Sequence, residues 1–203
     1  MDPSVATQLI VLFVLLLLSA FFSSAETSLT TVNKLRIRSL MEDGVRGAKR
    51  INDLIENPSK MISAILIGNN IVNISASALT TTLVINLGLN EYAAVATGIL
   101  TLLVLVFGEI TPKTLATMYA EKMAFLYAPV IAPLTKLLTP VIFILNQVSA
   151  LFLRLFRINP NAKTNTMTEN ELLTIVDVSH EDGVIESEER LMITNVVDFG
   201  DSL

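Results

Sequence analysis

LIVLFVLLLLSAFFSSAETSL, residues 9–29, is a continuous apolar run that ends in small polar residues. A membrane-spanning helix needs about 20 mostly apolar residues, and this run reaches that length. A cleaved signal peptide would begin with a positively charged region, whereas Asp2 is the only charged side chain ahead of the run and a basic segment follows it. The run therefore predicts a membrane span and a chain embedded in a bilayer.

The rest of the chain supports this prediction, since 52% of its residues are hydrophobic and its mean hydropathy is positive. Residues 61–87 and 92–111 form two further runs of spanning length. A fourth run, residues 125–156, is long enough to span but contains three prolines and Lys136. We predict three spans, with the fourth run broken into interfacial or half-inserted helices. The alternative is a fourth full span, which would place the C-terminal segment on the other side of the membrane.

Charge is divided unevenly along the chain: basic residues gather between the first two runs and acidic residues gather after the fourth. By the positive-inside rule, residues 33–60 are cytoplasmic, and the N-terminus and residues 88–91 lie outside. With three spans the C-terminus is cytoplasmic, and we expect a multi-pass protein of the plasma or inner membrane. The basic residues of the first loop are Lys34, Arg36, Arg38, Arg46, Lys49, Arg50 and Lys60.

These patterns predict an all-α membrane protein with three transmembrane helices, juxtamembrane or re-entrant helices and a small acidic cytosolic helical bundle. Residues 1–160 are expected to form a transmembrane domain and residues 161–203 the acidic cytosolic segment. Residues 35–57 predict one or two short amphipathic helices that end at Asn57-Pro58, and Pro58-Ser59 is expected to start the next helix. Thr168-x-x-Glu171 is a capping-box pattern at the start of the acidic segment.

The composition also excludes several classes of site. The chain has no cysteine and one histidine, so it can form neither a disulfide nor a zinc site of the usual kind. It has no nucleophile–base pair, no phosphate-binding loop and no catalytic metal motif, so we do not expect an enzyme. We expect no nucleic-acid partner either.

The first polar cluster in the apolar sequence consists of serines near the end of the first run. Ser24 and Ser28 are four residues apart and share one helix face, and Ser23 adjoins them. Serine hydroxyls in membrane helices commonly bond to their own backbone, which is the alternative to a ligand role. Glu26 faces away from Ser24 and Ser28, so we expect it to pair with a basic residue.

The second cluster is the set of asparagines Asn69, Asn70 and Asn73 in the second run. Asn69 and Asn73 are four residues apart, and Asn70 and Asn73 are three apart, so all three lie on neighbouring faces. An asparagine in hydrocarbon must find a polar partner, and contacts between helices hardly account for three within five residues. The cluster therefore favours a functional role.

The third cluster is GEITPK, residues 108–113. A carboxylate such as that of Glu109 is costly within a span and indicates function by default. Pro112 has no N–H, so the carbonyl of Gly108 loses its α-helical partner and becomes available to a cation. The break at Pro112 also predicts a flexible, gating position. The alternative role for Glu109 is an ion pair with Lys113, four residues later.

Together, these clusters offer hydroxyls, amide oxygens, a backbone carbonyl and one carboxylate. Such a set suits a hard cation such as Mg²⁺, Ca²⁺ or Na⁺ rather than zinc or copper. These residue types do not choose among the hard cations.

Three segments carry a family resemblance: SAFFSSAETSL (19–29), ILIGNNIVNI (65–74) and GEITPKT (108–114). Occurring in this order, they resemble the signature segments of the CorC/CNNM (cyclin M) family, and the resemblance extends into the acidic tail. It implies Mg²⁺ export, coupled to Na⁺ entry, by a homodimer with three spans per protomer. It also implies that Mg²⁺ is held by residues of these segments. The implied metal ligands are Ser23, Ser24, Ser28, Asn69, Asn70, Asn73, Gly108 and Glu109, with Pro112 and Lys113 at the helix break.

Members of that family usually continue into a pair of ATP-binding CBS domains, which this sequence lacks. We therefore expect it to be the transport part of a longer chain, with ATP acting only through the absent domains. The leading hypothesis is a Mg²⁺ transporter in contact with membrane lipid. The alternative is a membrane Mg²⁺ sensor that regulates another transporter or channel.

Overall fold

The computed structural model describes residues 3–155, 169–181 and 183–200, and these are helical apart from short turns. Among these residues, three helical stretches are long and apolar enough to cross a membrane: Val5–Thr31, Pro58–Asn86 and Ala93–Met118. They correspond to α1 (Pro3–Thr31), to α4 (Pro58–Asn86) and to a composite third span. The third span consists of α5 (Ala93–Leu103), the π-helix η2 (Val104–Ile110) and α6 (Thr111–Met118). The predicted all-α membrane fold with three spans is confirmed.

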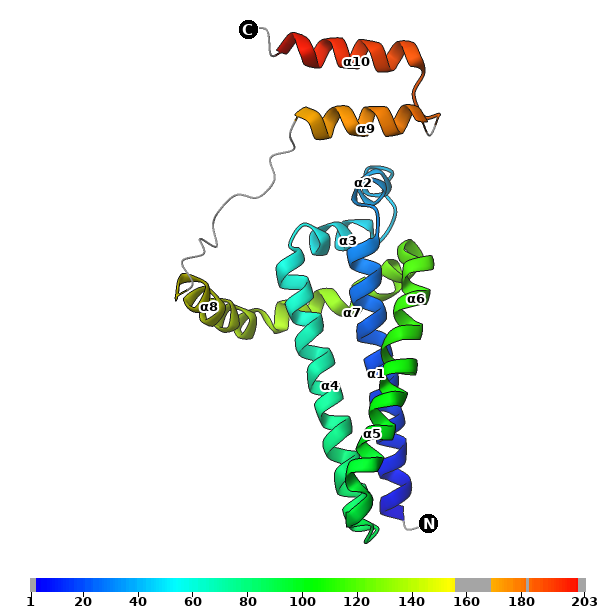
Figure 1. Cartoon of the computed structure of the whole chain (residues 1–203), viewed down its shortest axis with the longest axis vertical. Coiled ribbons are helices and arrows are strands. Elements are labelled where there is room, and N and C mark those ends of the chain that lie inside the picture. Colours follow the sequence, from blue (N-terminus) through cyan, green and yellow to red (C-terminus); the bar gives the residue numbers. More distant parts are fainter. Residues whose placement is uncertain (1–2, 156–168, 182, 201–203) are drawn as a thin grey trace. The chain divides into compact units, whose positions relative to one another are not determined.

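The three spans lie side by side, with the N-terminus and the α4–α5 turn at one end of the bundle (Figure 1). Gly88 ends α4 in a left-handed conformation with φ +71°. Its N–H donates to the Ile85 carbonyl, and the Leu89 N–H donates to the Val84 carbonyl. This pair of bonds is a Schellman motif, which satisfies carbonyls at a helix end and suits glycine. A short 3₁₀ turn, η1 (Asn90–Tyr92), then leads into α5.

Two short helices at the other end of the bundle confirm the predicted juxtamembrane segment: α2 (Lys34–Glu42) and α3 (Ala48–Ile55). The Asn33 side chain caps α2 by accepting from the N–H groups of Leu35 and Arg36, at 2.9 and 3.1 Å. Pro58 begins α4, as the Asn57-Pro58 pattern predicted.

The hydrophobic core lies where α1, α2, α3, α4 and α7 meet, at the α2–α3 end of the bundle. Elsewhere the spans expose most of their apolar side chains, as helices that face lipid do. The core residues are Ala25, Leu29, Val32, Ile37, Ile51, Leu54, Ile55, Met61, Ile65, Ala124, Ala128 and Ile131.

The fourth apolar run forms α7 (Ala120–Leu137) and α8 (Thr139–Leu155), two helices bent by 67° relative to each other. α7 crosses the bundle and contacts α1, α3 and α4 (Figure 1). The run is thus bent rather than one straight span, in agreement with the expected broken segment.

The chain divides into two compact units, residues 1–148 and 149–203, so the division falls inside α8. The predicted boundary at residue 160 lies outside the described residues, as does Thr168 of the capping-box pattern. The second unit contains α9 (Glu169–Glu181) and α10 (Ser187–Gly200), which pack as a hairpin. Arg190 Nε lies 2.6 Å from Asp177 Oδ1 and links the two helices.

Candidate functional site

The candidate site lies where α1, α4 and η2 come together within the bundle. Ser19 of α1 is 1% exposed, and its hydroxyl donates to Asn69 Oδ1 on α4 at 3.4 Å. Gly108 of η2 is buried against the same serine: a Cβ at Gly108 would lie 3.0 Å from Ser19 Oγ and 3.3 Å from Ser19 Cβ. The missing side chain of Gly108 therefore lets the third span approach α1 closely at the level of Asn69.

A second contact joins α4 to the third span one turn further along α4. The Asn73 side-chain N–H donates to Glu109 Oε1 at 3.5 Å. Asn73 Oδ1 is buried and has no hydrogen-bond partner. A buried amide oxygen without a donor is costly, and a cation would satisfy it. The pair thus supplies a carboxylate and a free amide oxygen within one contact.

The serines of α1 differ in what their hydroxyls bond. Ser24 donates to the Ala20 carbonyl at 2.8 Å and Ser28 to the Ala25 carbonyl at 3.2 Å, so both satisfy their own helix. Ser23 is 0% exposed, and its hydroxyl has no hydrogen-bond partner. The backbone-bonding interpretation therefore holds for the first two hydroxyls, whereas Ser23 offers a free one. The lone pairs of Ser24 and Ser28 remain available in principle, so their ligand roles stay predictions.

Sequence reasoning missed Ser19 as a candidate. Ser19 precedes Ser23 by four residues and thus shares its helix face. The four-residue spacing could have identified Ser19 as a candidate. Ser19 directly follows the apolar residues 9–18, however, and was therefore counted with the apolar run. The asparagines are also not equivalent, because Asn69 and Asn73 are half-buried and Asn70 is exposed on the outside of the described bundle. The structure does not bring Asn70 to this contact, and its ligand role stays a prediction.

The backbone near Pro112 is wound more loosely than an α-helix. The Thr111 N–H donates to the Val106 carbonyl five residues back, as in a π-helix, and α6 then begins with Pro112 in its first turn. With hydrogen bonds to the fifth residue back, the carbonyl that loses its partner at Pro112 is that of Phe107. The sequence predicted the carbonyl of Gly108, one residue later. π-Helical turns occur frequently at functional sites. The structure thus contains a helix irregularity at the predicted break, and gating there stays a prediction.

Lys113 pairs with Glu26 rather than with Glu109. Its Nζ lies 3.3 Å from Glu26 Oε2, which joins the third span to α1. The expectation that Glu26 pairs with a basic residue is confirmed, and the alternative ion pair between Lys113 and Glu109 is wrong in the described structure. Within the described residues, the Glu109 carboxylate accepts a hydrogen bond from the Asn73 amide and forms no ion pair. The carboxylate therefore remains available to a cation.

The donor atoms at this site are all oxygens: the Glu109 carboxylate, the amides of Asn69 and Asn73, and the hydroxyls of Ser19 and Ser23. In the part of the chain that the structure describes, no group of three or more histidine or acidic side chains could hold a metal. The oxygen ligands gathered at this site are of the kind that suits a hard cation.

The fold and this site define a multi-pass membrane protein with polar residues at the centre of a three-helix bundle. Residues 10–189 match the family described as "Cyclin M transmembrane N-terminal domain". The chain belongs to this cyclin M (CNNM) family, a family of transporter-type membrane proteins.

Curated relatives agree with this assignment. The "UPF0053 inner membrane protein YfjD" of Escherichia coli K12 is 39% identical over 89% of this chain, which spans 42% of that protein. A "UPF0053 protein" of Haemophilus influenzae is 37% identical over 93% of this chain and 45% of its own length. A more distant relative, the "Polyamine export protein" of Haemophilus influenzae, is 27% identical over 91% of this chain and 45% of its own length. The chain therefore spans less than half the length of these relatives.

Proposed function

We propose that this chain transports Mg²⁺ through the site formed by α1, α4 and η2. The observation that carries the proposal is the contact between Asn73 and Glu109, in which a carboxylate lies beside a buried amide oxygen that has no donor. The free Ser23 hydroxyl supports the proposal, because protein oxygens must replace the water ligands that a cation loses on dehydration. Mg²⁺ dehydrates reluctantly, so a carboxylate charge is the group best able to offset that cost.

The identity of the cation comes from the resemblance of the three signature segments, since oxygen ligands alone suit several hard cations. On the same basis, export is driven by Na⁺ entry and the working unit is a homodimer. In this mechanism the site opens alternately to each side of the membrane, and the loosely wound η2 segment supplies the movement. A site this rich in ligands favours a transporter over an open channel, because tight binding slows the exit of an ion.

The proposed orientation places the N-terminus outside and α2 and α3 in the cytoplasm. The chain has no cysteine, so a single introduced cysteine gives an unambiguous label. Leu89→Cys in the exposed α4–α5 turn should react with a membrane-impermeant maleimide from outside. Asp43→Cys after α2 should react only after the membrane is opened. The reverse pattern would overturn the orientation.

The test of transport is Mg²⁺ flux in liposomes that contain the purified protein, with and without a Na⁺ gradient. Glu109→Gln keeps the size of the side chain and removes its charge, and it should abolish flux. Glu91→Gln removes an exposed carboxylate in η1, away from the site, and should leave flux unchanged. Equal flux from Glu109→Gln and the original protein would rule out this site.

Two other outcomes would identify other functions. Mg²⁺ binding in calorimetry without flux under either gradient would favour the sensor. Spermidine flux that Mg²⁺ does not inhibit would favour polyamine export, the activity in the name of one relative. We favour Mg²⁺ because Glu26 and Glu109 are the only acidic residues in the three spans, and Glu26 is paired with Lys113. One carboxylate, that of Glu109, is left for a cation. A linear polyamine carries several separated charges and would need more carboxylates.

A further inference from the structure

A second polar site lies apart from the ion site, at the α2–α3 end of the bundle. It is a cavity of about 490 Å³ between α3, the first turn of α4 and α7. Four cationic side chains line it, and one acidic side chain, Asp53, accompanies them. The cations are Lys49 and Arg50 of α3, Lys60 of α4 and Lys136 of α7.

These four cations have no ion-pair partner among the described residues, although other basic side chains nearby do. Arg36 Nε lies 3.5 Å from Glu121 Oε2, and Arg38 Nη2 lies 3.8 Å from Glu56 Oε1. Glu121 and Glu56 thus pair with basic residues outside the cavity. The cavity keeps an excess of positive charge drawn from three separate helices, which is an arrangement for an anion rather than one solvated helix face.

The walls of the cavity indicate what kind of anion fits. Leu54, Met61 and Ala132 form an apolar side, and Asn57 and Thr135 add polar groups. Its occupant therefore has a charged end and an uncharged or apolar end. An inorganic ion would use only the cationic side.

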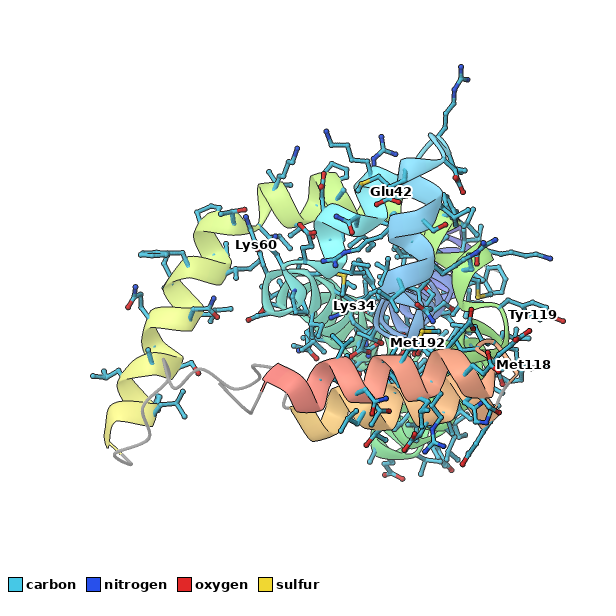
Figure 2. The ribbon with its side chains drawn as sticks, turned by 90° about the horizontal axis from the view of Figure 1, so that it is seen from above. Lys34, Glu42, Lys60, Met118, Tyr119 and Met192 are labelled. Atoms are coloured by element: carbon cyan, nitrogen blue, oxygen red, sulfur yellow. The ribbon has the colours of Figure 1, made fainter. Side chains whose placement is uncertain are left out.

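The position of the cavity indicates where that occupant comes from. Lys60 is in the first turn of α4, the span Pro58–Asn86, and it lies beside α7 when the bundle is viewed from the α2–α3 end (Figure 2). The start of a span is the level at which lipid headgroups meet protein. Leu137, the neighbour of Lys136, is 74% exposed, so an apolar surface adjoins the cationic one.

We propose that this cavity binds the phosphate headgroup of an anionic phospholipid, with the acyl chains leaving along the apolar surface. Basic pockets between helices on the cytoplasmic side of a membrane are suited to such headgroups. The lysines and Arg50 contact the phosphate, and the apolar wall contacts the glycerol backbone. The site does not depend on which cation the protein transports.

The test is native mass spectrometry of the whole chain, purified in non-ionic detergent, stripped of lipid and titrated with phosphatidylglycerol or phosphatidylcholine. The original protein should hold one phosphatidylglycerol more tightly than any phosphatidylcholine. The double variant Lys60→Gln, Lys136→Gln should weaken that lipid by about thirtyfold, because each basic side chain near an anionic lipid contributes roughly fivefold. Lys122→Gln, a matched change on α7 outside the cavity lining, should have no effect.

The result that overturns the proposal is equal phosphatidylglycerol affinity in the double variant and in Lys122→Gln. If the double variant does not fold, Lys60→Gln and Lys136→Gln are tested separately, with about fivefold expected for each. Displacement of the lipid by free glycerol phosphate would assign the cavity to a soluble phosphate compound and overturn the lipid assignment. Carbodiimide cross-links from Lys60 or Lys136 to α10 that persist in excess phosphatidylglycerol would assign it to the acidic hairpin instead.

Discussion

Replacing Gly68 by alanine tests how closely α4 and α1 pack beside the candidate site, since Gly68 directly precedes Asn69. A Cβ at Gly68 would lie 2.5 Å from both Cε1 and Cζ of the Phe22 ring. Real Cβ atoms do not approach so closely, so the ring or the helix must move. Neighbouring rings restrict the movement of Phe22. Its ring packs edge-on against Phe21 with a centroid distance of 5.4 Å, and Phe21 packs against Tyr127 with a centroid distance of 5.0 Å.

The magnitude follows from two opposing terms. Overpacking a fitted contact costs about 1–3 kcal/mol. Alanine gains up to about 1 kcal/mol over glycine in a helix interior. Gly98→Ala isolates the second term, because nothing lies within 4 Å of a Cβ at Gly98 in α5. The free energy of unfolding should therefore be about 1–3 kcal/mol lower for Gly68→Ala than for Gly98→Ala.

The measurement is an SDS titration of the purified protein in mild detergent, followed by near-ultraviolet circular dichroism. The chain has three tyrosines and no tryptophan, so the signal reports tyrosine packing, including that of Tyr127. A second variant, Phe22→Leu, removes the ring that meets the new methyl group. Gly68→Ala combined with Phe22→Leu should cost less than the sum of the two single changes.

Two results would refute this reasoning. One is equal stability of Gly68→Ala and Gly98→Ala, which would mean that the two helices separate at no cost. The other is strict additivity of Gly68→Ala and Phe22→Leu, which would mean that the ring does not limit the approach.

Two further predictions concern the site itself. Lys113→Gln should lower stability by about 1 kcal/mol, because it removes the cationic partner of Glu26, whose side chain is 26% exposed. Calorimetry should find its Mg²⁺ affinity close to that of the original protein, and a large increase would mean that Lys113 neutralises Glu109. Ser19→Ala should cost about 1 kcal/mol by leaving Asn69 Oδ1 without its donor. Ser24→Ala should cost less, because Ser24 bonds only to its own helix, and equal costs for the two serines would contradict the interhelical bond.

The sequence predicted the features that depend on local pattern. Span positions follow from hydropathy over about 20 residues, and that property needs no knowledge of neighbours. The start of α4 at Pro58 follows from proline's fixed φ and missing N–H. The three polar clusters were also evident, because a polar residue in an apolar run is conspicuous wherever the helix turns.

The choice of partners could not be predicted in the same way. Lys113 is correctly spaced for Glu109, and nothing in the chain signals that Glu26, 87 residues earlier, is nearer to its amine. Adjacent asparagines differ by about 100° around a helix, so the axis of α4 must be oriented before Asn69 can be distinguished from Asn70. The π-helical winding of η2 likewise depends on how Gly108 packs against Ser19.

The partner of Lys113 decides what the embedded part of the chain offers to a cation. Two carboxylates, Glu26 and Glu109, lie in the first and third spans with this single lysine, which can neutralise only one of them. Lys113 pairs with Glu26, which lies seven residues after Ser19. The carboxylate without a cationic partner is therefore that of Glu109, beside the Asn73 amide. A carboxylate without a cationic partner is expensive in a bilayer and persists where function requires it. Under the proposed function, the transported cation is the missing partner of Glu109, and the Glu26 pair keeps Lys113 away from that position.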